Sequence, residues 1–279
     1  MLPQKRQRIN SLNSANNNFI VDSHCHLNYK GLDEDIKGVI ARANDRNVQT
    51  LLAINTKIHE FDSVYKIAEE NENVFATVGV HPHEADTIDG LEVDTLLSRA
   101  IKPKCVGLGE TGLDYYYDNA PREKQRDNFR LHIHAAQESG LPLVVHTRDA
   151  EDDTLNIMSE EMKNKPYKGV IHCFTASQNL ADTCLDMGFY ISLSGILTFK
   201  NARDLQDTAK TIPLNRVLVE TDAPFLAPIP HRGQICEPAY TADTLAFLAN
   251  LRDMDEAELM AHTTDNFFTL FDKAHRPNL

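Results

Sequence analysis

Two histidines separated by a single residue, His24 and His26, stand at the end of a short apolar run that begins at Phe19. Successive side chains of a β-strand point to opposite faces, so two residues at this spacing share a face. Two imidazoles on one face can bind one cation. The pair therefore indicates one wall of a metal site, provided that other strand ends face the same space.

Further potential metal ligands stand at the ends of other apolar runs: His81, Glu110, His146, His172 and Asp222. Mixed imidazole and carboxylate ligands suit Zn²⁺, Mn²⁺ or Fe²⁺, and they suit Mg²⁺ where water completes the coordination. These are more donors than one ion needs, which predicts a two-metal site. Glu110 is the expected bridge between the ions because a carboxylate has two oxygens.

Other polar and aromatic residues near these positions have two interpretations each. Arg148 follows His146 by two residues and shares its face if the strand continues, so it is expected either to bind a phosphate or to form a structural ion pair. The tyrosines at 115–117 suit base stacking or simple loop packing. His132 lies in a helical pattern, which favours a structural role.

The elements that would position these residues alternate along the whole chain. Apolar residues recur at helical spacing at 36–43, 61–68 and 255–271, between short apolar runs typical of parallel strands buried on both faces. The predicted strands are 19–26, 48–55, 74–81, 105–110, 141–146, 169–174, 189–194 and 217–221. This alternation predicts an α/β protein with a single (β/α)8 TIM barrel, whose function collects at the carboxyl ends of the strands.

The composition excludes several other classes of protein. A net charge of −13 in 279 residues argues against a broad basic surface that coats nucleic acid. No apolar run is long enough to span a membrane. Five cysteines without a CxxC pair indicate free thiols in a reducing compartment, the cytoplasm or, in a eukaryotic cell, the nucleus. Residues 1–18 are basic and rich in Ser and Asn, so we expect a disordered tail, with a targeting segment as the alternative, before one barrel domain at 19–279.

The sequence around the candidate ligands resembles the TatD family of metal-dependent deoxyribonucleases, within the wider amidohydrolase-like barrels. The resemblance covers nearly the whole chain, from residue 19 to about 271. The matching stretches are DSHCHL at 22–27, GVHPH at 79–83, GETGLDY at 109–115, HTRDA at 146–150, HCF at 172–174, SGILTF at 194–199, ETDAP at 220–224 and TTDN at 263–266.

This resemblance implies a hydrolase that cleaves phosphodiester bonds of DNA, as a 3′–5′ exonuclease, with RNA as a further substrate. It also implies two divalent ions, Mg²⁺, Mn²⁺ or Zn²⁺. By motif position, the implied ligands are His24, His26 and Asp222 for the first ion, His146 and His172 for the second, and Glu110 between them.

Three further roles form our hypothesis of the mechanism. Asp222 would accept the proton of the attacking water, His81, which the resemblance also marks, would contact the phosphate or protonate the departing oxygen, and Arg148, by its position on the strand, would bind the phosphate. One position departs from the family pattern, because Cys236 stands where the family usually has Asn. This departure puts the local hydrogen bonding of the loop in question, but not the metal centre.

Two other functions are compatible with the same scaffold. One is a different hydrolase, such as a D-aminoacyl-tRNA deacylase. Many binuclear amidohydrolases bridge their metals with a carboxylated lysine at the end of the fourth strand, where this chain has Glu110, and this difference favours the nuclease. The other is a non-catalytic accessory protein, which the complete set of expected ligands argues against.

Overall fold

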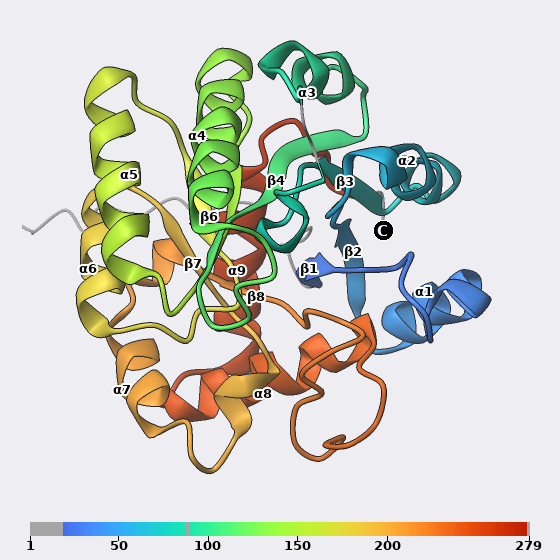
Figure 1. Ribbon diagram of the computed structural model, residues 1–279. Coiled ribbons are helices and arrows are strands. Elements are labelled where there is room, and N and C mark those ends of the chain that lie inside the picture. Colours follow the sequence, from blue (N-terminus) through green and yellow to red (C-terminus); the bar gives the residue numbers. More distant parts are fainter. Residues whose placement is uncertain (1–18, 88–89, 278–279) are drawn as a thin grey trace, which may run out of the picture.

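The computed structural model describes residues 19–87 and 90–277 of the chain. Its centre is a ring of eight parallel strands in the order β1-β2-β3-β4-β5-β6-β7-β8 (Figure 1). The predicted tail at 1–18 lies outside the described residues. The strands are β1 (Ile20–Cys25), β2 (Val48–Ala53), β3 (Val74–Val78), β4 (Cys105–Asp114), β5 (Leu143–Arg148), β6 (Gly169–Ile171), β7 (Tyr190–Leu193) and β8 (Val217–Val219).

Helices surround this ring and connect its strands (Figure 1). Within 19–87 and 90–277, no helix has both the length and the apolar character needed to cross a membrane. The helices are α1 (Ile36–Asp45), α2 (Phe61–Glu70), α3 (Val93–Ala100), α4 (Arg122–Ser139), α5 (Glu151–Asn164), α6 (Gln178–Asp186), α7 (Arg203–Thr211), α8 (Thr241–Leu251) and α9 (Glu256–Leu270). Short 3-10 helices cover Asp33–Asp35, Ile58–Glu60, Pro82–Glu84, Gly195–Thr198, Leu214–Arg216 and Pro238–Tyr240.

The ring nearly closes where β1 meets the segment after β8. Cys25 forms a parallel bridge with Ala223, and the Asp222 N–H donates to the His24 carbonyl at 2.9 Å. The buried carboxylate of Asp22 accepts hydrogen bonds from both the N–H and the hydroxyl of Thr221, at 3.0 and 2.6 Å. The predicted single (β/α)8 barrel is therefore confirmed, and the seam joins two of the motifs that contain predicted metal ligands.

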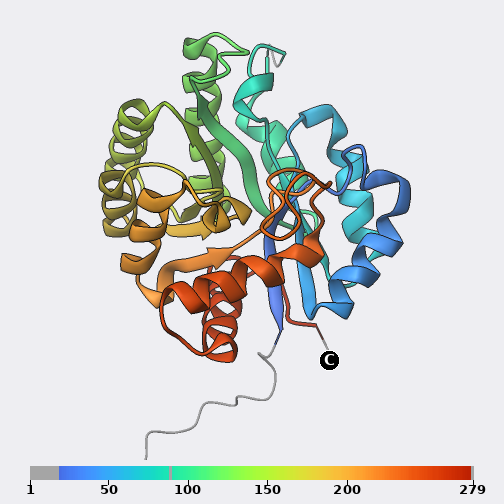
Figure 2. The ribbon, with the colours of Figure 1, turned by 90° about the horizontal axis from the view of Figure 1, so that it is seen from below.

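Two apolar clusters hold the barrel together. One lies between the sheet and the surrounding helices. The other fills the ring and includes one residue from each strand: Val21, Leu52, Phe75, Val106, Val144, Val170, Tyr190 and Leu218. Phe267, Leu270 and Phe271 at the end of α9 join this inner cluster. Helix α9 packs beside the start of β1 and closes this end of the barrel (Figure 2), which leaves the opposite, carboxyl end for the site.

Several strand boundaries differ from the sequence-based ranges, and one difference matters for the site. The fourth strand was expected to end at Glu110, but β4 continues to Asp114 because its last residues pair with β5, Gly112 with His146 and Asp114 with Arg148. Strand β5 accordingly begins two residues later than expected and ends at Arg148, while β6 and β8 end before the polar residues that follow them.

Candidate metal centre

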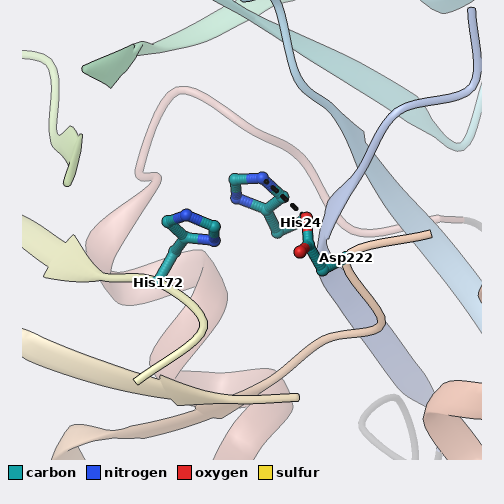
Figure 3. Close-up of side chains that lie close together, drawn as sticks. All are labelled: His24, His172 and Asp222. Atoms are coloured by element: carbon teal, nitrogen blue, oxygen red, sulfur yellow. Dashed lines mark ion pairs between the residues drawn. The ribbon is translucent and has the colours of Figure 1, made fainter. Parts of the chain in front are cut away.

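The carboxyl end of the barrel brings the predicted ligands together from elements spread around the ring. His24 belongs to β1, Glu110 to β4 and His146 to β5. His172 directly follows β6, and Asp222 comes three residues after β8. Figure 3 shows His24 paired with Asp222, and the His172 ring stacks on the His24 ring with centroids 3.8 Å apart.

The first cluster of donor atoms contains two imidazoles and two carboxylates. The Nε2 atoms of His24 and His26 are 3.3 Å apart. The Oδ1 of Asp222 lies 3.6 Å from the first of these nitrogens and 3.2 Å from the second. The Oε2 of Glu110 lies 3.3 Å from His24 Nε2 and 3.7 Å from His26 Nε2. Four donors thus converge on one small space.

A second cluster gathers around the other carboxylate oxygen of the same glutamate. The Oε1 of Glu110 lies 2.8 Å from His172 Nε2, 3.2 Å from His146 Nδ1 and 3.3 Å from His81 Nε2. His146 Nδ1 and His172 Nε2 are 3.3 Å apart. The two oxygens of Glu110 therefore face two separate sets of imidazoles.

The environment of Glu110 suits a residue that holds cations. The carboxylate is buried, and its Oε2 has no hydrogen-bond partner among the described residues. Burial alone would raise the pKa of Glu110, but the neighbouring imidazoles of His172, His81 and His24 lower it well below its usual value. An ionised, buried oxygen without a donor is costly unless a cation balances it. Imidazole and carboxylate groups in this number fit two divalent ions.

Contacts on the side away from Glu110 orient the rings of two histidines. His146 directs Nε2 to Asp114 Oδ2 at 3.1 Å, and His172 directs Nδ1 to Glu220 Oε1 at 3.3 Å. Each ring also faces Glu110 through its other nitrogen, so carboxylates lie on both sides of it. With the proton held on the side of Asp114 or Glu220, the nitrogen that faces Glu110 would offer its lone pair to a metal.

His81 differs from these histidines in the direction of its hydrogen bond. Its Nδ1 accepts the backbone N–H of His83 at 3.1 Å, so the neutral ring carries its proton on Nε2. That proton points at Glu110 Oε1. Burial lowers the pKa of His81 to about 4, which favours this neutral form. A protonated Nε2 suits a hydrogen-bond donor and not a metal ligand, which agrees with the predicted phosphate contact.

Two other predicted roles can be compared with the structure. Arg148 is exposed at the end of β5, where its Cζ lies 4.0 Å from the Tyr116 ring centroid and 4.8 Å from that of Tyr117. No ion pair of Arg148 with an acid occurs in the described part of the chain. His132 is buried, accepts the Val80 N–H through Nε2 and donates from Nδ1 to a carbonyl of its own helix, which is the expected structural role.

The loop that contains Cys236 keeps its backbone anchored despite the departure from the family pattern. Cys236 is buried, and its N–H donates to the Pro224 carbonyl at 3.0 Å. Burial raises the pKa of its thiol well above the usual value. A neutral, apolar side chain at this position therefore supports the loop by packing.

Sequence reasoning missed Asp114 and Glu220 as parts of the centre. Asp114 accepts from both His83 and His146 through Oδ2, and its Oδ1 accepts the backbone N–H groups of Tyr116 and Tyr117. The period of a strand would have found it, because residues 110, 112 and 114 share one face when β4 is extended. Glu220 directly follows the buried strand β8, and its only signal in the sequence is its place in the ETDAP motif at 220–224.

The fold and the site together define a class, the metal-dependent hydrolases built on a (β/α)8 barrel. The model of the family described as TatD related DNase matches residues 21–272. The chain therefore belongs to the TatD family.

Relatives agree with this assignment. The uncharacterized metal-dependent hydrolase YcfH of Escherichia coli (strain K12) is 44% identical over 91% of this chain and 96% of its own length. The 3′-5′ ssDNA/RNA exonuclease TatD of Salmonella typhimurium is 32% identical over 86% of this chain and 94% of its own. The crystal structure of YjjV, a TatD homologue from Escherichia coli, superposes with a TM-score of 0.85 at 26% identity, covering 91% of this chain and 98% of that one.

Proposed function

We propose that this protein is a phosphodiesterase that uses two divalent ions to hydrolyse DNA from its 3′ end. The observation that carries the proposal is the position of Glu110, whose two oxygens face two separate donor clusters. A pair of metal ions close together suits in-line displacement at phosphorus, since both the attacking and the leaving oxygen need stabilisation.

The direction of cleavage and the type of substrate rest on one relative. The Salmonella protein is named a 3′-5′ exonuclease of single-stranded DNA and RNA. We therefore propose the same direction of cleavage for this chain and include RNA as a further substrate. The cavity above the centre has a volume of about 640 Å³ and opens between aromatic side chains and Arg148, which suits a nucleotide chain.

The ligands of the first ion would be His24, His26 and Asp222, those of the second His146 and His172, and Glu110 would bridge. The ions, Mg²⁺, Mn²⁺ or Zn²⁺, would lower the pKa of a bound water and balance charge on the phosphoryl oxygens.

The remaining chemistry belongs to the side chains. Asp222 accepts the proton of the attacking water, and the Nε2–H of His81 donates to the phosphate or to the departing oxygen. Arg148, at the mouth of the cavity, binds the phosphate that follows along the strand.

The test uses metal-free protein and a single-stranded DNA labelled at its 3′ end. Addition of Mg²⁺ or Mn²⁺ should restore release of labelled nucleotides. Glu110→Gln should lower the rate at least about a hundredfold, since it removes charge stabilisation shared by both donor clusters. The exposed Glu123→Gln in α4 serves as the control and should match the wild type.

Two results would overturn the proposal. One is full activity of the Glu110→Gln variant. The other is a wild-type enzyme that deacylates D-aminoacyl-tRNA but leaves every DNA end intact.

A further inference from the structure

One side of the cavity is formed by two aromatic residues, Tyr29 and Phe225, which we call the first aromatic wall. The Tyr29 ring stacks on His26 with centroids 4.7 Å apart, and the Phe225 ring meets it edge to face at 6.0 Å. The hydroxyl of Tyr29 is held by Thr56 at 2.8 Å. Phe225 is nevertheless 49% exposed, so a large apolar ring faces the cavity without a cover.

A second aromatic wall consists of Tyr116 and Tyr117, which are 57% and 54% exposed. Tyr117 meets the His83 ring edge to face at 5.4 Å and lines the cavity. The guanidinium of Arg148 lies over both tyrosine rings. Because Asp114 binds the backbone N–H of each tyrosine, this wall is attached to the carboxylate that orients His146.

The two walls stand on opposite sides of the barrel mouth. In the first wall, Phe225 follows β8 and Tyr29 follows β1, and these two strands meet at the seam. The second wall follows β4 and lies beside Arg148, the last residue of β5. In a ring of eight strands, β8 and β4 are four positions apart, as are β1 and β5. The first wall adjoins the first donor cluster through His26, and the second adjoins the second cluster through His83 and Asp114.

The exposed aromatic rings of the described residues are concentrated at this cavity. Within the described residues, the exposed large hydrophobic side chains include three aromatic rings, Phe225, Tyr116 and Tyr117, and all three belong to the two walls. Exposed aromatic surface beside a functional cavity is typical of a binding site. Flat apolar faces near a phosphodiester centre suit the faces of nucleobases, which stack on aromatic rings with little dependence on sequence.

We propose that each wall binds one base, so that two consecutive unpaired nucleotides flank the scissile phosphodiester. This inference rests on the proposed function and assigns the residues that hold the bases of its single-stranded substrate. In a duplex the penultimate base stacks on both faces and the terminal base has only one free face, so a paired end cannot supply both walls with a base. The phosphate between the two bases then lies over Glu110, between the two donor clusters.

The first part of the test compares variants that keep or remove the ring. Phe225→Leu and Tyr117→Leu should each raise KM for single-stranded DNA about tenfold, since one base loses its stacking partner. Their kcat should stay close to that of the wild type because the lost contact is made equally before and during reaction. Phe225→Tyr and Tyr117→Phe keep the ring and should keep the wild-type KM. Metal content and melting temperature verify that the variants are intact.

The second part uses substrates with one abasic nucleotide, either terminal or penultimate. On one of these substrates, each Leu variant should have the same KM as the wild type, because the base that its wall would bind is absent. The abasic position that removes the difference in KM should not be the same for the two variants. Leu variants with the wild-type KM, or two variants sensitive to the same position, would overturn the two-wall assignment while DNA hydrolysis itself persists. A wild-type enzyme that hydrolyses no DNA would instead refute the proposed function, and this inference with it.

Discussion

At the scale of single residues, hydrogen bonds determine which nitrogen of each histidine faces the centre. His146 and His81 lie within 3.3 Å of the same Glu110 oxygen, yet they are prepared for different tasks. Asp114 faces Nε2 of His146, and a proton held there would leave a lone pair on Nδ1 for a metal. The backbone of His83 instead donates to His81, whose Nε2 keeps its proton. Under the proposed function, Asp114 and the backbone of His83 thus distinguish a metal ligand from a proton donor.

This difference predicts the effect of Asp114→Asn. The amide no longer carries the charge that keeps the proton of His146 on Nε2, so the affinity of the second metal site should fall about 10–100-fold. The first site should keep its affinity, because its histidines do not contact Asp114. Calorimetric titration of metal-free protein with Mn²⁺ measures both sites. Asp118→Asn, an exposed acid of the same loop, is the control, and equal weakening of both sites would contradict the assignment.

At the scale of elements, helix α4 supports the segment that carries two of the rim histidines. His132 projects from α4 and accepts the Val80 N–H at 3.1 Å, and the amide of Asn128 donates to the Val80 carbonyl at 2.8 Å. Val80 lies between the end of β3 and His81. The backbone groups of Val80 therefore bond to a helix that follows the next strand, whereas the N–H groups of Gly79 and His81 bond to Asn55 and Thr56, which follow β2.

The buried His132 predicts a specific loss of stability in acid. Burial lowers its pKa from 6.5 to about 4, so the unfolded chain takes up a proton before the folded protein does. The contribution of the neutral ring is complete above pH 6.5 and is lost as the pH falls towards 4, by about 3 kcal/mol in total. Urea unfolding in the presence of EDTA should show this loss in the wild type.

A His132→Gln variant provides the comparison, because its amide oxygen can still accept from Val80 but does not titrate. Below pH 6.5 the free energies of unfolding of the two proteins should converge as the wild type loses its advantage. Above pH 6.5 the difference between them should be constant, which serves as the internal control. A constant difference down to pH 4 would show that His132 is not the group responsible.

At the scale of the whole molecule, the candidate metal centre connects strands that are far apart in the ring. Its donors belong to β1, β4 and β5 and to the segments after β6 and β8, so both sides of the seam contribute. Carboxylates and imidazoles that are buried together without a cation repel or compete for protons. Bound ions would balance these charges and link the strands at the carboxyl end of the barrel, as α9 links them at the amino end.

Removal of metal should therefore destabilise the protein. At an ion concentration a hundred times the dissociation constant, one site adds about 2.7 kcal/mol to the free energy of unfolding. Chelation should lower the melting temperature, and Mn²⁺ should restore it. The Glu110→Gln variant should show a smaller metal-dependent increase than the wild type. If elemental analysis shows that the metal has left while the melting temperature is unchanged, the centre does not link the strands in this way.

Features that depend on local periodicity could be predicted from the sequence. The alternation within a strand placed His24 and His26 on one face, and apolar runs between helical patterns indicated the barrel. Because every strand of a parallel barrel runs in the same direction, residues at the ends of distant runs were expected to meet. This reasoning placed the histidines and carboxylates of the strand ends in one site, and the family resemblance selected the six predicted ligands among them, whose side chains the structure brings together.

Features that depend on strand register and on hydrogen-bond direction required the tertiary structure. Asp114 and His146 are 32 residues apart, and Glu220 and His172 are 48 apart, so no local pattern joins them. Their contacts follow from how far β4 pairs with β5 and from where the short strands end. The sequence shows which residues at the strand ends carry potential metal-binding atoms. Only the tertiary structure shows which oxygen faces which nitrogen, because each contact depends on atoms from several strands at once.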